Sequence, residues 1–145
     1  MVALEEKKQG ARLLVETVTT RIPRAFGVDP VRDVQVLVPT HRGPMGAQAL
    51  NEALQAALNP DAPRGKRGFA VGDKVMQHKN DYDLDVWNGD VGVVARADGD
   101  KLAVMVDGRE VLYSGTAVDN LSLAYAATVH KAQGSEYDVV VVGLH

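Results

Sequence analysis

Cysteine is absent from this 145-residue chain, and the aromatic content is low, with one tryptophan and two phenylalanines. Without thiols the chain has neither a disulfide framework nor a thiolate metal site. No apolar run is long enough to cross a bilayer, and no spacing of His, Asp and Glu indicates a metal centre. The first residues are charged and lack an apolar signal core. We therefore expect a cytoplasmic protein without a membrane partner or a bound metal ion.

A large excess of charge of one sign is also missing. Lys and Arg number 16 against 19 Asp and Glu, for a net charge of −3. This charge balance disfavours a protein that binds nucleic acid over its whole surface, but it allows a local basic groove. The densest basic cluster, residues 64–67, is expected to be a solvated loop. With 46% hydrophobic residues, the chain can form a true globular core.

The first sixty residues have the pattern of an α/β layer. Residues 3–22 carry apolar side chains at helical spacing, and Pro23 predicts the end of that helix or a kink in it. A buried strand is expected at 34–39, then a turn at 40–46, then a second helix that stops at Asn59. The order helix, strand, loop, helix predicts part of an α/β fold.

A β-meander follows. Between residues 69 and 116 short β segments alternate with Asp-Gly pairs, which predict hairpins. Asn88-Gly89 predicts a tight turn with positive φ at both central positions. The size and rhythm are those of a small SH3-like barrel. Strands expected at 123–129 and 139–144 then restore the α/β pattern.

Two turns and one loop carry candidate chemistry. Residues 128–136 place a hydroxyl, an imidazole, an ammonium, an amide, a glycine and a carboxylate between two buried strands, where parallel sheets bind ligands. The turn at 40–46 precedes a helix N-terminus, which can bind anions. The long loop with Lys79, Tyr82 and Trp87 suits base stacking. Ordinary polar turns, a plain helix cap and a Trp87 packed in the barrel core are the competing interpretations.

Three blocks in this order resemble superfamily 1 DNA helicases of the RecD-like (exodeoxyribonuclease V alpha) branch. The first resembles motif IV, the second the entry into the SH3-like 2B insertion, and the third motif V. The blocks are Val36–Gly46 with Ala49-Leu50-Asn51; Gly72–Gln77 with Asn80-Asp81-Tyr82 and Val86–Gly92; and Thr128–Glu136.

The resemblance implies a partial RecA-like (P-loop NTPase-type) parallel sheet, the 2A motor domain, at residues 1–68 and 117–145. The SH3-like 2B barrel would be inserted at residues 69–116. The resemblance also implies which residues form the nucleotide and DNA sites. Nucleotide-facing positions would be Arg42, Gln133, Gly134 and Glu136, and DNA-binding positions would be Thr40, His41, Lys79, Trp87, Asn88, Thr128, His130 and Lys131. Whether Arg42 meets nucleotide or DNA is left open.

The implied function is part of an ATP-dependent 5′-to-3′ DNA helicase of recombination and repair. The partners would be single-stranded DNA, the first RecA-like motor domain and subunits of a nuclease complex. ATP and Mg²⁺ would serve the full-length protein. The chain has no G-x-x-x-x-G-K-[ST] loop, no Walker acidic motif and no motif VI. We therefore expect a C-terminal fragment that binds neither ATP nor Mg²⁺ tightly and hydrolyses no ATP by itself. Two alternatives are a stand-alone single-stranded nucleic-acid-binding module and a peptide-binding adaptor.

Overall fold

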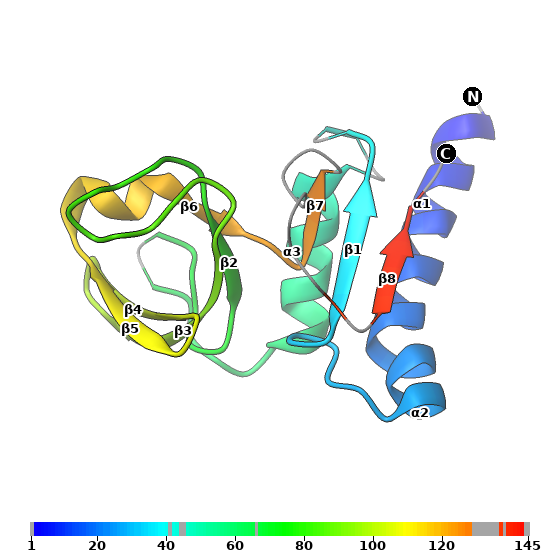
Figure 1. Ribbon diagram of the computed structural model, residues 1–145. Coiled ribbons are helices and arrows are strands. Elements are labelled where there is room, and N and C mark those ends of the chain that lie inside the picture. Colours follow the sequence, from blue (N-terminus) through cyan, green and yellow to red (C-terminus); the bar gives the residue numbers. More distant parts are fainter. Residues whose placement is uncertain are drawn as a thin grey trace. The chain divides into compact units, whose positions relative to one another are not determined.

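A computed structural model of the chain is shown in Figure 1. It describes residues 2–40, 42–43, 46–65, 67–128, 137 and 139–143. The chain folds into two compact units, one formed by residues 1–60 and 125–145 and the other by residues 61–124. We call them the sheet unit and the barrel unit, and describe each by itself.

The sheet unit is built on three parallel strands. Strand β1 (Val34–Val38) lies between β7 (Ala126–Thr128) and β8 (Val139–Val142). Its residues Val34, Val36 and Val38 are buried, as a central parallel strand requires. The expected α/β fold with a parallel sheet is therefore confirmed.

The N-terminal helix continues past Pro23. Helix α1 (Val2–Glu16) runs through a π-helical turn, η1 (Thr17–Arg21), into α2 (Ile22–Phe26). A proline lacks the N–H of the regular helical ladder, and the wider π turn just before it accommodates that loss. The helix ends at Gly27, whose φ of 66° permits a left-handed cap. Pro23 therefore does not end the helix.

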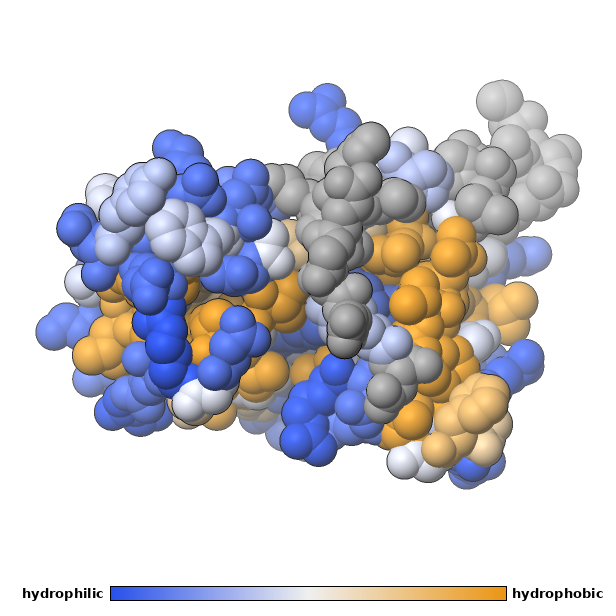
Figure 2. All heavy atoms as spheres, in the orientation of Figure 1, coloured by the Kyte–Doolittle hydropathy of each residue, from blue (hydrophilic) through white to orange (hydrophobic). Residues whose placement is uncertain are grey.

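Helix α3 (Ala47–Leu58) packs on the sheet through its buried residues Leu50 and Leu54. Helices α1 and α3 contact each other, and Figure 1 draws both behind the sheet. On strand β8, Val140 and Val142 are 49% and 54% exposed. Figure 2 shows hydrophobic surface over this strand.

The barrel unit is a five-stranded antiparallel sheet that wraps around its own core. The strand order is β5-β4-β3-β2-β6, and a 3₁₀ helix, η2 (Gly115–Asn120), precedes the last strand. The core contains Val75, Val86, Val104, Tyr113 and Val118, with other buried residues. The strands are β2 (Lys74–Gln77), β3 (Val91–Asp98), β4 (Lys101–Val106), β5 (Arg109–Tyr113) and β6 (Leu121–Leu123).

The observed unit boundaries differ from the expected ones. The barrel unit begins near residue 61 rather than 69 and ends near 124 rather than 116. Strand β6 belongs to the barrel because it pairs with β2, and Arg67 pairs with Asp119 of η2. The strand expected at 123–129 is in fact parts of two strands in different sheets, which are separated by Ala124 and Tyr125. The Ala124 N–H still donates to the Lys74 carbonyl of the barrel (2.8 Å).

The turns follow the sequence with one exception. Asp107 and Gly108, between β4 and β5, both have positive φ (48° and 80°), as the Asp-Gly hairpin predicts. In the turn at residues 87–90, however, only Gly89 of the two central residues has a positive φ, at 98°. The turn closes through the Asp90 N–H, which donates to the Trp87 carbonyl (3.0 Å), and with a positive φ at its second central residue alone it has the pattern of a type II turn, which needs one glycine.

Candidate nucleic-acid interface

The first group of predicted residues lies at the carboxyl edge of the parallel sheet. Val38 at the end of β1 is in register with Thr128 at the end of β7. Thr40 follows β1 two residues later and is exposed. The sheet therefore brings the turn after β1 and the start of the turn after β7 to one edge, where ligands bind in open parallel sheets.

The turn after β1 depends on glycine. The Thr40 hydroxyl donates to the Arg42 carbonyl (3.0 Å), and the Ala47 N–H donates to the Thr40 carbonyl (3.0 Å). A Cβ built on Gly46 would lie 2.3 Å from the Arg42 carbonyl oxygen, so this position tolerates no side chain. The compact turn leaves the Arg42 side chain exposed, with no ion pair to any residue that the structure describes.

Half of the predicted site lies outside the described residues, and its positions stay predictions. These are His41, His130, Lys131, Gln133, Gly134 and Glu136.

The second group lies on the long loop between β2 and β3. Val86, and not Trp87, enters the barrel core. Trp87 is 39% exposed and packs against Tyr82, which is 79% exposed. The two ring centroids are 5.1 Å apart and the ring planes meet at 81°. The interpretation of Trp87 as a core residue is therefore wrong, and the loop presents an aromatic pair to solvent.

Lys79 and Asn88 lie on the same loop, and both are exposed. The Asn88 N–H donates to Asn80 Oδ1 (2.9 Å), and the Trp87 N–H donates to Asp90 Oδ2 (2.9 Å). These bonds fix the backbone on either side of the tryptophan. The loop thus brings Lys79, Trp87 and Asn88 together, whereas Thr40, Arg42 and Thr128 lie in the sheet unit.

A buried network supports the base of this loop. The Tyr113 hydroxyl donates to Gln77 Oε1 (2.8 Å), and Gln77 Nε2 donates to the Lys79 carbonyl (2.8 Å). Burial, with a smaller contribution from the carboxylates of Asp81 and Asp90, raises the pKa of Tyr113 to about 12. No sequence pattern points to this network, because Gln77 and Tyr113 are far apart in the chain.

Because the pKa of Tyr113 is raised in the folded state, the free energy of unfolding should depend on pH in the alkaline range. An unfolded tyrosine ionises near its ordinary pKa of about 10, while the folded Tyr113 keeps its proton to about 12. Its contribution is therefore fully present below about pH 10 and is lost as the pH rises towards 12, by roughly 2–3 kcal/mol in total. We expect the free energy of unfolding to fall more steeply over this window in the wild type than in Tyr113→Phe. If the free energies of unfolding, measured by urea titration at each pH, fall equally steeply with pH in both proteins, this prediction is wrong.

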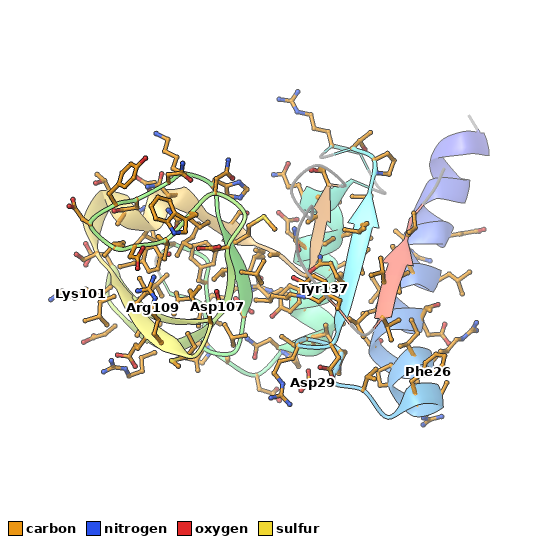
Figure 3. All side chains as sticks on the ribbon, viewed as in Figure 1. Phe26, Asp29, Lys101, Asp107, Arg109 and Tyr137 are labelled. Carbon is orange, nitrogen blue, oxygen red and sulfur yellow. The ribbon has the colours of Figure 1, made fainter. Side chains whose placement is uncertain are left out.

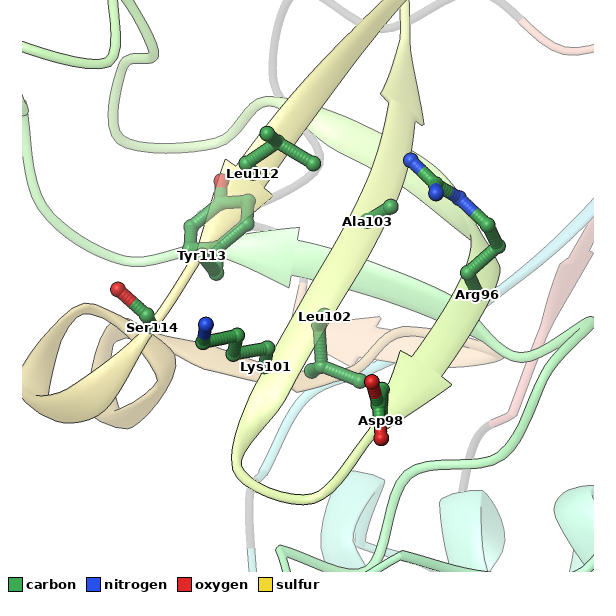
Figure 4. A pocket seen from close by; sticks show the side chains of 8 residues that line it. All are labelled: Arg96, Asp98, Lys101, Leu102, Ala103, Leu112, Tyr113 and Ser114. Atoms are coloured by element: carbon green, nitrogen blue, oxygen red, sulfur yellow. The ribbon is translucent and has the colours of Figure 1, made fainter.

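A hollow of about 350 Å³ lies on another part of the barrel (Figure 4). Charged side chains of Arg96, Asp98 and Lys101 surround the apolar Leu102, Ala103 and Leu112. Arg96 is paired with Glu110, and the hydroxyl of Tyr113 is bonded to Gln77. None of the predicted site residues lines this hollow.

Two classes of site find no support in the part of the chain that the structure describes. No group of three or more His, Asp or Glu side chains there is arranged to hold a metal ion. None of the helices there has the length and apolar character needed to span a bilayer.

Comparison with protein families matches both units. The model of the ATP-dependent RecD-like DNA helicase SH3 domain matches residues 50–107, and the model of the UvrD-like helicase C-terminal domain matches residues 123–143. The first match covers most of α3 and strands β2 to β4 of the barrel, including the loop with Tyr82 and Trp87. The second begins at the end of β6 and continues through β7 and β8.

Among curated relatives, the ATP-dependent RecD2 DNA helicase of Deinococcus radiodurans is 44% identical over 119 residues, which are 77% of this chain and 16% of that protein. The RecBCD enzyme subunit RecD of Mycolicibacterium smegmatis is 32% identical over 109 residues, 74% of this chain and 19% of that subunit. The chain therefore spans less than a fifth of the length of these relatives.

A solved structure shares the fold. The Pif1 helicase from Bacteroides, in a crystal structure with ADP-AlF3 and single-stranded DNA, matches 97% of this chain and 42% of its own, with a TM-score of 0.57 and 17% identity. At this identity the likeness concerns the fold alone.

Proposed function

We propose that this chain, which belongs to the RecD-like branch of superfamily 1 DNA helicases, binds single-stranded DNA as part of an ATP-dependent motor. One observation carries the proposal. The region similar to the RecD-like helicase SH3 domain folds as a barrel whose long loop exposes the aromatic pair Tyr82–Trp87. Exposed aromatic rings that stack on unpaired bases are the usual means of sequence-independent single-strand binding.

The sheet unit would be the 2A motor domain and the barrel unit the 2B insertion. Thr40, Thr128 and the neighbouring His41, His130 and Lys131 would contact the DNA backbone at the carboxyl edge of the sheet. Contacts of this kind hold a strand without reading its sequence. Lys79 and Asn88 would assist Trp87 on the barrel.

ATP would be held between this chain and the first RecA-like motor domain of a longer protein. The exposed Arg42 fits the role of a cation that reaches phosphate from the sheet edge, and we propose Gln133, Gly134 and Glu136 as further nucleotide-facing positions. The sequence contains no G-x-x-x-x-G-K-[ST] loop, so the phosphate cradle and the Mg²⁺ site would come from the partner domain. ATP, when bound there, would supply the energy for movement along DNA.

The biological setting completes the proposal. We place the motor in the cytoplasm, in DNA recombination and repair, moving 5′ to 3′. Subunits of a nuclease complex are further candidate partners, because one relative is a subunit of the RecBCD enzyme.

Fluorescence anisotropy with a labelled oligothymidylate tests the DNA assignment. We expect weak binding whose affinity falls as salt rises from about 50 to about 200 mM, since backbone contacts release counterions. Trp87→Ala should weaken binding about tenfold, the value of one stacked base. Phe26→Ala, which removes an exposed aromatic ring at the end of α2, should not. No binding by the wild type even at low salt would refute the assignment.

A further inference from the structure

We propose that the corner between Tyr82 and Trp87 is a stacking site for a single unpaired nucleobase, and that Gln77 and Arg109 are positioning residues that hold this corner in shape before DNA binds. The inference rests on the proposed single-strand binding and adds to it a ligand group, a second aromatic residue and two supports.

The geometry of the pair fits one flat ligand. Because the ring planes meet at 81°, the two rings form an edge-to-face corner rather than a flat stack. A base that stacks on the free face of one ring therefore meets the other ring at its side, so the corner offers a flat aromatic ligand one face and one side wall. Tyr82, with 79% of its surface exposed, forms the open wall, and Trp87 forms the more buried one.

The barrel holds the loop from two sides. At its base, the Gln77 side chain donates to the Lys79 carbonyl, and the Gln77 carbonyl accepts the Gly89 N–H (2.8 Å). At its tip, the guanidinium of Arg109 on β5, labelled in Figure 3, donates to the carbonyls of Leu84 (3.2 Å) and Asp85.

Asp85 itself has a φ of 57°, an uncommon conformation for a residue with a side chain. The two Arg109 contacts are to the carbonyls of the peptide groups on either side of the Asp85 Cα, and so stabilise this unusual backbone. Within the loop, Asp81 and Val86 exchange two backbone hydrogen bonds of 2.8 and 3.1 Å. Tyr82 therefore lies in a closed loop, in which residues 82–85 are enclosed by the Asp81–Val86 pair and Arg109 ties the loop to the barrel.

Charge decides which part of the DNA reaches the corner. Four carboxylates lie on this loop. Those of Asp81 and Asp90 accept the backbone N–H groups of Leu84 and Trp87, while those of Asp83 and Asp85 are exposed. Against these four carboxylates stand Lys79 on the loop and the Arg109 guanidinium bonded to it, so the net charge is negative and repels phosphate, and the favourable contact at the two rings is with the π face of a base. The corner should then contribute affinity that depends little on salt, unlike the backbone contacts of the sheet unit.

Trp87 is the only tryptophan of the chain, so its fluorescence reports the corner directly. We expect oligothymidylate to quench it and an abasic oligonucleotide of equal length to leave it unchanged. Tyr82→Ala should weaken binding of oligothymidylate about fivefold to tenfold at both low and high salt, whereas Tyr82→Phe should bind as the wild type. Equal quenching by the abasic strand would show a backbone contact and overturn the inference.

Two further results would separate the inference from the function on which it rests. Binding seen by anisotropy without any change of Trp87 fluorescence would leave single-strand binding intact and refute the corner. Quenching by an arginine-rich peptide, with none by oligothymidylate, would make the corner a cation–π site for a basic partner and refute the nucleobase assignment. Absence of all DNA binding would refute the proposed function itself.

The positioning role is tested without DNA. In Arg109→Ala we expect a higher rate of acrylamide quenching of Trp87, together with a threefold to tenfold loss of oligothymidylate affinity. Gln77→Leu should act in the same direction. Arg96→Ala removes another barrel arginine, which is paired with Glu110 on the same sheet. It should change neither the acrylamide quenching of Trp87 nor the affinity for oligothymidylate. Unchanged quenching and affinity in Arg109→Ala, with the barrel still folded by circular dichroism, would refute the positioning role.

Discussion

Asn51→Leu is expected to destabilise the sheet unit by about 3–5 kcal/mol, enough to unfold a marginally stable unit. The buried Asn51 side chain on α3 donates to the Ala126 carbonyl (2.9 Å) and accepts the Ala126 N–H (2.8 Å). It thus satisfies both backbone polar groups of Ala126 on β7. Leucine has a similar volume but leaves two buried polar groups without a partner, and each such group costs about 1–3 kcal/mol.

Far-ultraviolet circular dichroism measures this effect, because all the α-helices that the structure describes lie in the sheet unit. Urea titration should show a lower midpoint for the helical signal. Gln48→Leu is the matched control, since it exchanges an exposed amide for leucine on the same helix and should stay within about 0.5 kcal/mol of the wild type. If both variants unfold at the wild-type midpoint, Asn51 does not hold the sheet edge.

Gly92→Ala is expected to destabilise the barrel by about 2–4 kcal/mol, by overpacking. A Cβ at this position of β3 would lie 2.5 Å from the Met105 carbonyl oxygen, 2.7 Å from a methyl group of Val104 and 2.9 Å from one of Val106. The nearest atom belongs to the backbone of a paired strand, which cannot move away without breaking the β3–β4 ladder. The same shift would disturb the loop before β3, so affinity for oligothymidylate should fall with stability.

Trp87 fluorescence follows this unfolding, because the only tryptophan lies in the barrel unit. Gly65→Ala is the matched control: the nearest atom to its added Cβ would be 3.5 Å away, an ordinary contact, and its stability should change by less than about 0.5 kcal/mol. A Gly92→Ala variant as stable as Gly65→Ala would show that β3 and β4 can separate locally at little cost.

Local patterns in the sequence determined the elements and their family. The apolar run of β1, the amphipathic spacing of α3 and the Asp107-Gly108 hairpin are properties of neighbouring residues, and the structure has them where they were expected. The three helicase-like blocks likewise depend on short stretches in a fixed order, and the family comparisons agree with the RecD-like family that they indicate. Of the two outcomes expected at Pro23, an end of the helix is excluded because a π turn precedes it, and Asn88 differs from expectation because a turn with one glycine was open to the same residues.

The tertiary structure alone decided that the strand expected at 123–129 is the end of one strand and the whole of another, and what surrounds the aromatic loop. Leu121–Leu123 pairs with β2 and Ala126–Thr128 with β1, a choice that depends on partners more than forty residues away. Trp87 faces solvent because Val86 occupies the core, and Gln77 and Arg109 support the loop through bonds to distant backbone groups. Such contacts are set by packing and by the need to satisfy buried polar groups, and these act between residues that no local pattern connects.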